Sequence, residues 1–121
     1  MQGRTDFAAL VVDDDEMLRE LIVRLLTELG LPTVLQARSA NDALQLLARH
    51  RPAWVFTDWS METPNAGLEV VRHAERHQLC VIVISGQPPR LPEGQPPVRW
   101  IPKIELSLER LRQELALPAG N

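Results

Sequence analysis

The chain has 121 residues, of which 45% are hydrophobic, and it carries 13 lysines and arginines against 16 aspartates and glutamates, a net charge of −3. This length and composition predict one soluble domain over residues 1–121, too short for two cores. Without a basic block, the chain has no surface that predicts binding to nucleic acid or to an anionic membrane.

A single cysteine, Cys80, excludes an internal disulfide and a cysteine-based zinc site, and it fits a reducing compartment. The N-terminal residues lack the basic segment and apolar core of a signal peptide. No apolar run approaches the ~20 residues that cross a bilayer. The expected location is therefore the cytoplasm.

In the first half of the chain, short apolar runs alternate with amphipathic segments. Residues 8–12 form a continuous apolar run, which predicts a strand covered on both faces, and residues 33–37 predict a second, weaker strand. A helix precedes Gly30 and Pro32, and Ser39 is the expected N-cap of the next helix. The apolar positions expected to face the core are Leu18, Leu21, Ile22, Leu25 and Leu29 in the first helix and Ala40, Ala43, Leu44 and Leu47 in the second.

The second half of the chain continues the alternation. Strands are predicted at residues 53–57, 80–84 and 98–101, and the second of these (CVIVI) is expected to be central, with Cys80 buried. A third helix contains Val70 and Val71, and Ser107 is expected to cap the last helix. Strands that alternate with helices at these spacings predict an α/β fold with a parallel sheet and right-handed crossovers.

One segment interrupts this pattern. Residues 86–97, GQPPRLPEGQPP, hold five of the ten prolines and two glycines. Proline removes a backbone donor and clashes inside a helix, so an irregular loop is predicted between the fourth and fifth strands.

Polar residues follow four of the predicted strands: Asp13 and Asp14, then Asp58, Ser85 and Lys103. Parallel sheets bind ligands beyond the carboxyl ends of their strands, so these side chains are expected to meet at one edge. Clustered carboxylates repel unless a cation neutralises them, and oxygen ligands suit Mg²⁺. Asp58 is then a candidate nucleophile, Lys103 a point charge and Ser85 a hydrogen-bond donor for phosphoryl transfer, with the carbonyl of Ser60 as a further metal ligand.

The motifs VVDDDE, DWSM, VISG and WIPK, in this order and each at a predicted strand end, resemble those of the receiver domains of two-component response regulators. The resemblance extends over essentially the whole chain. It implies a flavodoxin-like, doubly wound five-stranded parallel sheet of order 2-1-3-4-5. It also implies that Asp58 is the phosphoacceptor, Asp13 and Asp14 are metal ligands, Ser85 is the switch hydroxyl and Lys103 is the phosphate-contacting lysine. Trp100 falls where relatives usually have a tyrosine or phenylalanine that turns inward.

The chain departs from the usual receiver pattern at three places. Glu62 replaces a proline that commonly follows the acceptor, and Gly67 lies one residue further from Asp58 than is common. Ile104 follows Lys103 where a proline is frequent. The proline-rich segment 86–97 stands where relatives have their fourth helix, which carries part of the output surface.

The function that follows is a phosphoacceptor in a phosphorelay. A histidine kinase or a phosphotransfer protein would donate the phosphoryl group to Asp58 with Mg²⁺, and the output would be contact with an unknown downstream protein. The chain would not be an enzyme beyond its own phosphorylation and dephosphorylation, and homodimerisation stays open. One alternative is a receiver-fold binding module that works without phosphorylation. A second, an aspartyl-phosphate phosphatase, is disfavoured because Ser60 stands where such enzymes have a second acid.

Overall fold

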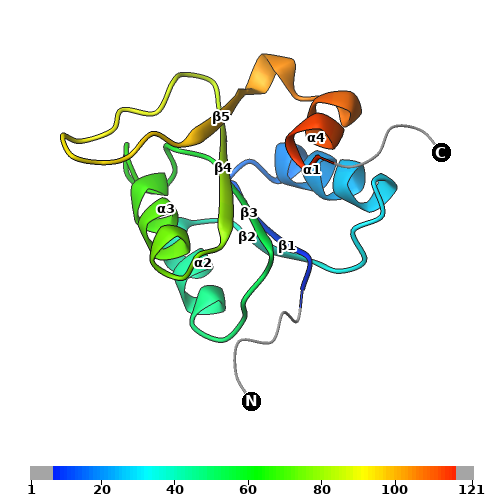
Figure 1. Cartoon of the computed structure of the whole chain (residues 1–121), viewed down its shortest axis with the longest axis horizontal. Helices are drawn as coiled ribbons and strands as arrows, with labels where there is room; N and C mark the ends of the chain where they lie inside the picture. The colour runs from blue at the N-terminus through cyan, green and yellow to red at the C-terminus, as the bar shows by residue number, and fades with distance from the viewer. Residues whose placement is uncertain (1–6, 117–121) are drawn as a thin grey trace.

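Five parallel strands form the central sheet of the computed structural model, which describes residues 7–116 (Figure 1). The strands are β1 (Ala9–Val12), β2 (Val34–Ala37), β3 (Trp54–Thr57), β4 (Cys80–Ser85) and β5 (Arg99–Pro102). Their order in the sheet is β2-β1-β3-β4-β5, and every neighbouring pair is parallel. The predicted fold class and strand order are confirmed, and each strand end lies within one residue of the predicted one.

Helices cover both faces of this sheet. They are α1 (Glu16–Glu28), α2 (Ala40–Leu47), α3 (Gly67–Arg76) and α4 (Leu108–Glu114), with a short 3-10 turn, η1 (Lys103–Glu105), before α4. Helices α1 and α4 lie on one face of the sheet and α2 and α3 on the other (Figure 1). No helix within residues 7–116 is long and apolar enough to cross a bilayer.

The central strands are buried on both faces, as their continuous apolar sequences predict. In β1, Ala9 and Val11 pack in the cluster that contains Ile22 of α1 and Leu111 of α4. Its alternate residues Leu10 and Val12 pack in the cluster formed with α2 and α3. Because side chains alternate along a strand, one apolar run supplies both cores.

Side chains cap the N-termini of α1, α2 and α4. Asp15 accepts hydrogen bonds from the backbone N–H groups of Met17 and Leu18 at the start of α1. Ser39 and Ser107 accept from the third residue of α2 and α4 respectively, which confirms both predicted caps.

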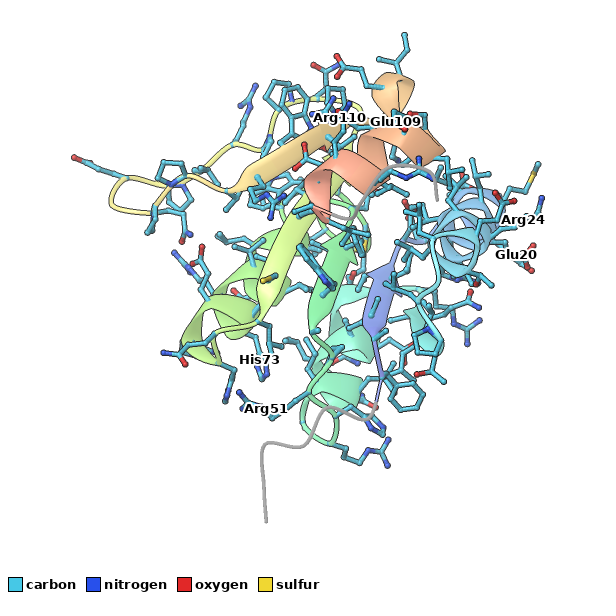
Figure 2. The ribbon with its side chains drawn as sticks, turned by 45° about the vertical axis from the view of Figure 1, so that its right-hand side comes forward. Glu20, Arg24, Arg51, His73, Glu109 and Arg110 are labelled. Atoms are coloured by element: carbon cyan, nitrogen blue, oxygen red, sulfur yellow. The ribbon has the colours of Figure 1, made fainter. Side chains whose placement is uncertain are left out.

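Two burial predictions are wrong. In α1, Leu21 is 39% exposed, whereas Leu26, which was not among the predicted core positions, is fully buried. The charged residues Glu20 and Arg24 project from the outer side of the same helix (Figure 2). Cys80 is exposed rather than buried, because β5 pairs with β4 only from Ile82 onward and leaves the first residues of β4 without a neighbour on that side.

The proline-rich segment contains no helix, as predicted. Residues 86–97 run as an irregular loop, the yellow segment between β4 and β5 in Figure 1, with one turn in which the N–H of Gln95 bonds the carbonyl of Pro92. We call this segment the proline loop. It occupies the position between β4 and β5 that a helix fills in an uninterrupted α/β alternation.

Candidate phosphoryl-acceptor site

The carboxyl ends of β1, β3, β4 and β5 bring the predicted site residues to one edge of the sheet. A cavity of about 630 Å³ opens there, and every predicted site residue except Asp13 lines it. The predicted members are Asp14, Asp58, Ser60, Ser85 and Lys103, and the other lining residues are Asp15, Trp59, Pro64, Asn65, Gly86, Gln87, Pro88 and Arg90. Asp13 lies beneath the cavity, with 1% of its surface exposed.

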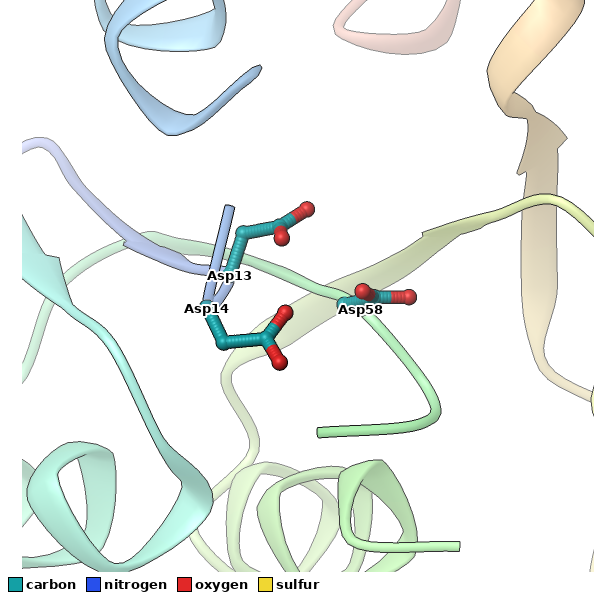
Figure 3. Close-up of side chains that lie close together, drawn as sticks. All are labelled: Asp13, Asp14 and Asp58. Atoms are coloured by element: carbon teal, nitrogen blue, oxygen red, sulfur yellow. The ribbon is translucent and has the colours of Figure 1, made fainter. Parts of the chain in front are cut away.

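Three carboxylates meet at this edge. Asp13 and Asp14 leave the end of β1, Asp58 leaves the end of β3, and the three side chains lie together (Figure 3). One oxygen of each lies within 4.8 Å of the others, a spacing at which one cation can contact all three. Asp13 and Asp58 are buried, while Asp14 is exposed to the cavity and to solvent.

Asp13 has an unsatisfied buried atom. Its Oδ1 accepts a hydrogen bond of 2.9 Å from the N–H of Asp15, but its Oδ2 has no hydrogen-bond partner among the described residues. Burial, with the nearby negative charges of Asp58 and Asp14, raises the pKa of Asp13 to about 6, against the lowering effect of the Asp15 N–H and of Lys103. A buried oxygen without a partner, beside two further carboxylates, is the arrangement that a bound divalent cation satisfies.

The two oxygens of Asp58 have different partners. Oδ1 accepts a 2.7 Å hydrogen bond from the N–H of Trp59, and Oδ2 lies 3.3 Å from the Nζ of Lys103. The same Nζ lies 4.0 Å from the unsatisfied Oδ2 of Asp13. Lys103 is therefore shared between two carboxylates that belong to different strands.

The loop after Asp58 is held close to the start of α3. The N–H of Gly67 donates to the carbonyl of Trp59 at 2.8 Å, and the indole Nε1 of Trp59 donates to Asn65 at 2.9 Å. A Cβ on Gly67 would lie 2.3 Å from the carbonyl oxygen of Asp58, so only glycine fits at this position. Ser60 is exposed, and its hydroxyl donates to the carbonyl of Pro64 at 2.6 Å.

Glu62 has a role that the sequence did not reveal. Its two carboxylate oxygens accept hydrogen bonds of 2.9 Å from the N–H groups of Ala40 and Asn41, so it caps the N-terminus of α2 from 21–22 residues away. Desolvation opposes ionisation, but these two backbone donors outweigh it and lower the pKa of Glu62. The glutamate at this position therefore ties the loop after Asp58 to α2. No local signal predicts such a contact, because the two partners are distant in sequence.

We expect Glu62→Ala to lower the free energy of unfolding by about 1 kcal/mol at neutral pH, because two backbone donors of α2 lose their acceptor and the helix dipole loses a charge. The contribution is fully present above the ordinary glutamate pKa of 4.5 and disappears as the pH falls through the lowered pKa of the folded state. Urea unfolding at several pH values measures it. Glu93→Ala is the matched control, since Glu93 is exposed on the proline loop; an equal loss in both variants would contradict the capping role.

The hydroxyl of Ser85 is engaged on both sides. It donates to the carbonyl of Gln87 at 2.6 Å and accepts from the indole Nε1 of Trp100, which lies 3.1 Å from Ser85 Oγ and 3.3 Å from Ser85 O. Trp100 is half-buried against the cluster that contains Val71 and Val83. An indole thus contacts Ser85 through a donor that a phenylalanine at this position would lack.

Residues 9–90 match the family model of the response regulator receiver domain. The chemotaxis protein CheY homolog of Campylobacter jejuni is 42% identical over 64 residues, which cover 52% of this chain and 48% of that protein. The chain therefore spans about half the length of the curated relatives it matches.

Solved structures with the same fold cover nearly the whole chain. The PhyR response regulator REC domain of Erythrobacter litoralis superposes with a TM-score of 0.76 at 20% identity, covering 97% of this chain and 95% of that one. The NtrX receiver domain of Brucella abortus gives 0.69 at 24% identity, covering 93% and 99%. At these identities the structural likeness establishes the fold alone.

Proposed function

The chain belongs to the response regulator receiver domain family, and from this premise we propose that it accepts a phosphoryl group on Asp58. The observation that carries the proposal is the environment of this carboxylate. It is buried at the edge of the sheet where ligands bind, held by the N–H of Trp59 and the Nζ of Lys103, and next to two further carboxylates. Its orientation is therefore set before a donor arrives.

In the proposed reaction, an oxygen of Asp58 attacks the phosphorus of a phosphohistidine. The new O–P bond forms as the P–N bond breaks, and the imidazole leaves with the bonding electron pair and takes up a proton. The Nζ of Lys103, 3.3 Å from Oδ2, neutralises charge on the acceptor and on the incoming phosphoryl group. A water later hydrolyses the acyl phosphate and restores Asp58.

The donor set fits Mg²⁺, with Asp13, Asp14 and Asp58 as carboxylate ligands and the carbonyl of Ser60 as a further one. The unsatisfied Oδ2 of Asp13 supports this assignment, because it supplies a buried oxygen that accepts no hydrogen bond from any protein group among residues 7–116. When bound, Mg²⁺ would neutralise negative charge that develops during transfer. The positions of the carboxylates themselves come from β1 and β3, not from the ion.

Ser85 provides the conformational readout. To donate to a phosphoryl group on Asp58, its hydroxyl must give up its 2.6 Å bond to the carbonyl of Gln87. That exchange removes the hydrogen bond from Ser85 that holds the carbonyl of Gln87 at the start of the proline loop. It also moves the hydroxyl that the indole of Trp100 contacts. Modification at Asp58 is thereby coupled to the segment between β4 and β5.

The proposed partners are a histidine kinase or a phosphotransfer protein as donor and a downstream protein that contacts the changed surface. The chain then acts as a signalling component rather than as an enzyme with turnover of its own. The phosphatase alternative remains disfavoured, because the Ser60 hydroxyl, which stands where an acid is needed, donates to the carbonyl of Pro64.

The test is labelling by acetyl phosphate with Mg²⁺, followed by intact-mass measurement. We expect the wild type to gain one phosphoryl group, with none gained in Asp58→Asn or when a chelator is present. Asp42→Asn is the control, because Asp42 lies on α2, outside the cavity, and should label normally. Stoichiometric labelling of Asp58→Asn would overturn the acceptor assignment.

The binding-only alternative is favoured by one observation, the missing helix between β4 and β5. It predicts no mass gain in the wild type under conditions that label ordinary receivers. The same experiment therefore separates the two functions.

A further inference from the structure

Two positively charged side chains, Lys103 and Arg90, line the acceptor cavity, and they differ in their contacts. Lys103 is engaged with Asp58 and, more distantly, with Asp13. Arg90, which comes from the proline loop, lines the same cavity but makes no ion pair or hydrogen bond with any part of the chain that the structure describes. We propose that Arg90 binds the phosphoryl group on Asp58 and so fixes the proline loop across the cavity, an inference that rests on the proposed function.

The backbone on both sides of Arg90 is anchored. The carbonyl of Gln87 accepts from Ser85, and Leu91 is half-buried against the cluster of Trp59, Val71 and Val83. Further along the loop, the side chain of Gln95 donates to Glu75 of α3 at 3.0 Å. Arg90 therefore lies between two fixed points at the mouth of the cavity, although its own side chain is exposed.

The surrounding prolines restrict the conformations of this stretch. Pro88 and Pro89 fix their own φ angles, and Pro92 biases Leu91 toward extended backbone. An irregular loop usually loses much conformational entropy when it becomes ordered. Here the prolines already restrict the backbone before any anion binds. Less conformational entropy is therefore lost when Arg90 binds an anion.

Phosphorylation of Asp58 adds negative charge to the cavity, which a second positively charged side chain can neutralise. Two carboxylates, Asp13 and Asp58, share Lys103 before modification, and an acyl phosphate adds about one further unit of negative charge. Lys103 is already shared, so Arg90 is the cationic side chain lining the cavity that is available for the added charge. The planar guanidinium of an arginine forms bidentate, charge-assisted hydrogen bonds with phosphate oxygens.

In the unmodified protein Arg90 pairs with none of the carboxylates that line the cavity, Asp14, Asp15 and Asp58. Asp58 is held by Lys103 and by the N–H of Trp59, and Asp15 caps α1. Ordering a long side chain for a solvated contact gives little net free energy. A phosphoryl group that projects from Asp58 into the cavity supplies the missing acceptor, and the loop then responds to phosphorylation in place of a helix.

The experiment titrates beryllofluoride, a phosphoryl mimic, into the full chain at saturating Mg²⁺ and follows tryptophan fluorescence. We expect Arg90→Gln to weaken beryllofluoride binding about tenfold and Arg90→Lys to weaken it less, since a lysine keeps the charge but loses the bidentate geometry. Mg²⁺ affinity without beryllofluoride should be unchanged in both variants, which separates a phosphoryl contact from a general structural role. Arg24→Gln, which removes one exposed arginine from the outer side of α1, is the control and should bind like the wild type (Figure 2).

The outcomes separate the role of Arg90 from the proposed function. Wild-type affinity in Arg90→Gln would overturn the role of Arg90 and leave the proposed function intact. An equal loss in Arg24→Gln would also overturn it, because the effect would then be one of net charge. Failure of the wild type to bind beryllofluoride at all would overturn the proposed function, and the role of Arg90 with it.

Discussion

Gly67→Ala is expected to lower the free energy of unfolding by about 3 kcal/mol or more, because the new methyl group has no space. Its Cβ would lie 2.3 Å from the carbonyl oxygen of Asp58 and 2.9 Å from the Cα of Trp59. Both are backbone atoms, which cannot move aside as a flexible side chain can. The gain in helix propensity from glycine to alanine, at most about 1 kcal/mol, is too small to offset this clash.

The same substitution should also disturb the acceptor. The clash pushes on the peptide that carries Asp58, and it breaks the 2.8 Å hydrogen bond from the Gly67 N–H to Trp59 if α3 moves away. Urea unfolding gives the stability change, and acetyl phosphate labelling gives the effect on Asp58. Gly86→Ala is the control, since nothing lies within 4 Å of a Cβ there, and its stability should stay within about 0.5 kcal/mol of the wild type. Equal stability losses in the two variants would contradict the packing argument.

Asp13→Asn is expected to stabilise the metal-free protein while abolishing tight Mg²⁺ binding. Burial is the main reason that the folded state raises the pKa of Asp13 from its ordinary value of 3.8 to about 6. Between these values the folded protein binds more protons than the unfolded chain, so stability falls as the pH rises through this window. Above about pH 6 the accumulated cost of the ionised carboxylate is on the order of 3 kcal/mol.

The asparagine variant removes that cost, since it carries no charge to desolvate. We expect a gain on the order of 2 kcal/mol at about pH 8 that fades as the pH falls toward 4, measured by urea unfolding in a chelator. Added Mg²⁺ should stabilise the wild type through mass action and leave Asp13→Asn nearly unchanged. Asp14→Asn is the informative comparison: Asp14 is exposed, so its loss should weaken Mg²⁺ binding without the gain in stability. A metal-free Asp13→Asn that is no more stable than the wild type would refute the burial cost.

The fold was predictable because its signals are local. The run ALVV in β1 is buried on both faces, as a continuous apolar segment predicts, and Ser39 and Ser107 cap their helices through bonds to the third helical residue. The absence of a helix in residues 86–97 follows directly from proline chemistry. Errors arose where neighbouring elements decide burial, as at Leu21, which lies at the edge of its helix face, and Cys80, which extends beyond β5.

The convergence of the strand-terminal residues was predictable from the sequence, but their contacts were not. Strand-terminal residues were expected to converge, and Asp58, Ser85 and Lys103 line one cavity above Asp13. The capping of α2 by Glu62 and the contact of Arg90 with the cavity were not expected. Each depends on a segment without regular structure, whose path the sequence pattern does not define.

The sequence by itself determined which residues end the strands, and therefore which side chains reach the open edge of the sheet. The apolar run of a strand and the polar residue that follows it are both features of a short stretch of chain. The tertiary structure alone decided how those side chains interact. It left Oδ2 of Asp13 buried without a partner, turned the hydroxyl of Ser85 toward Gln87, and brought Gly67 against the backbone of Asp58. Distances of a few ångströms between segments far apart in the chain depend on the packing of both layers of helices against the sheet, and no pattern within one segment specifies them.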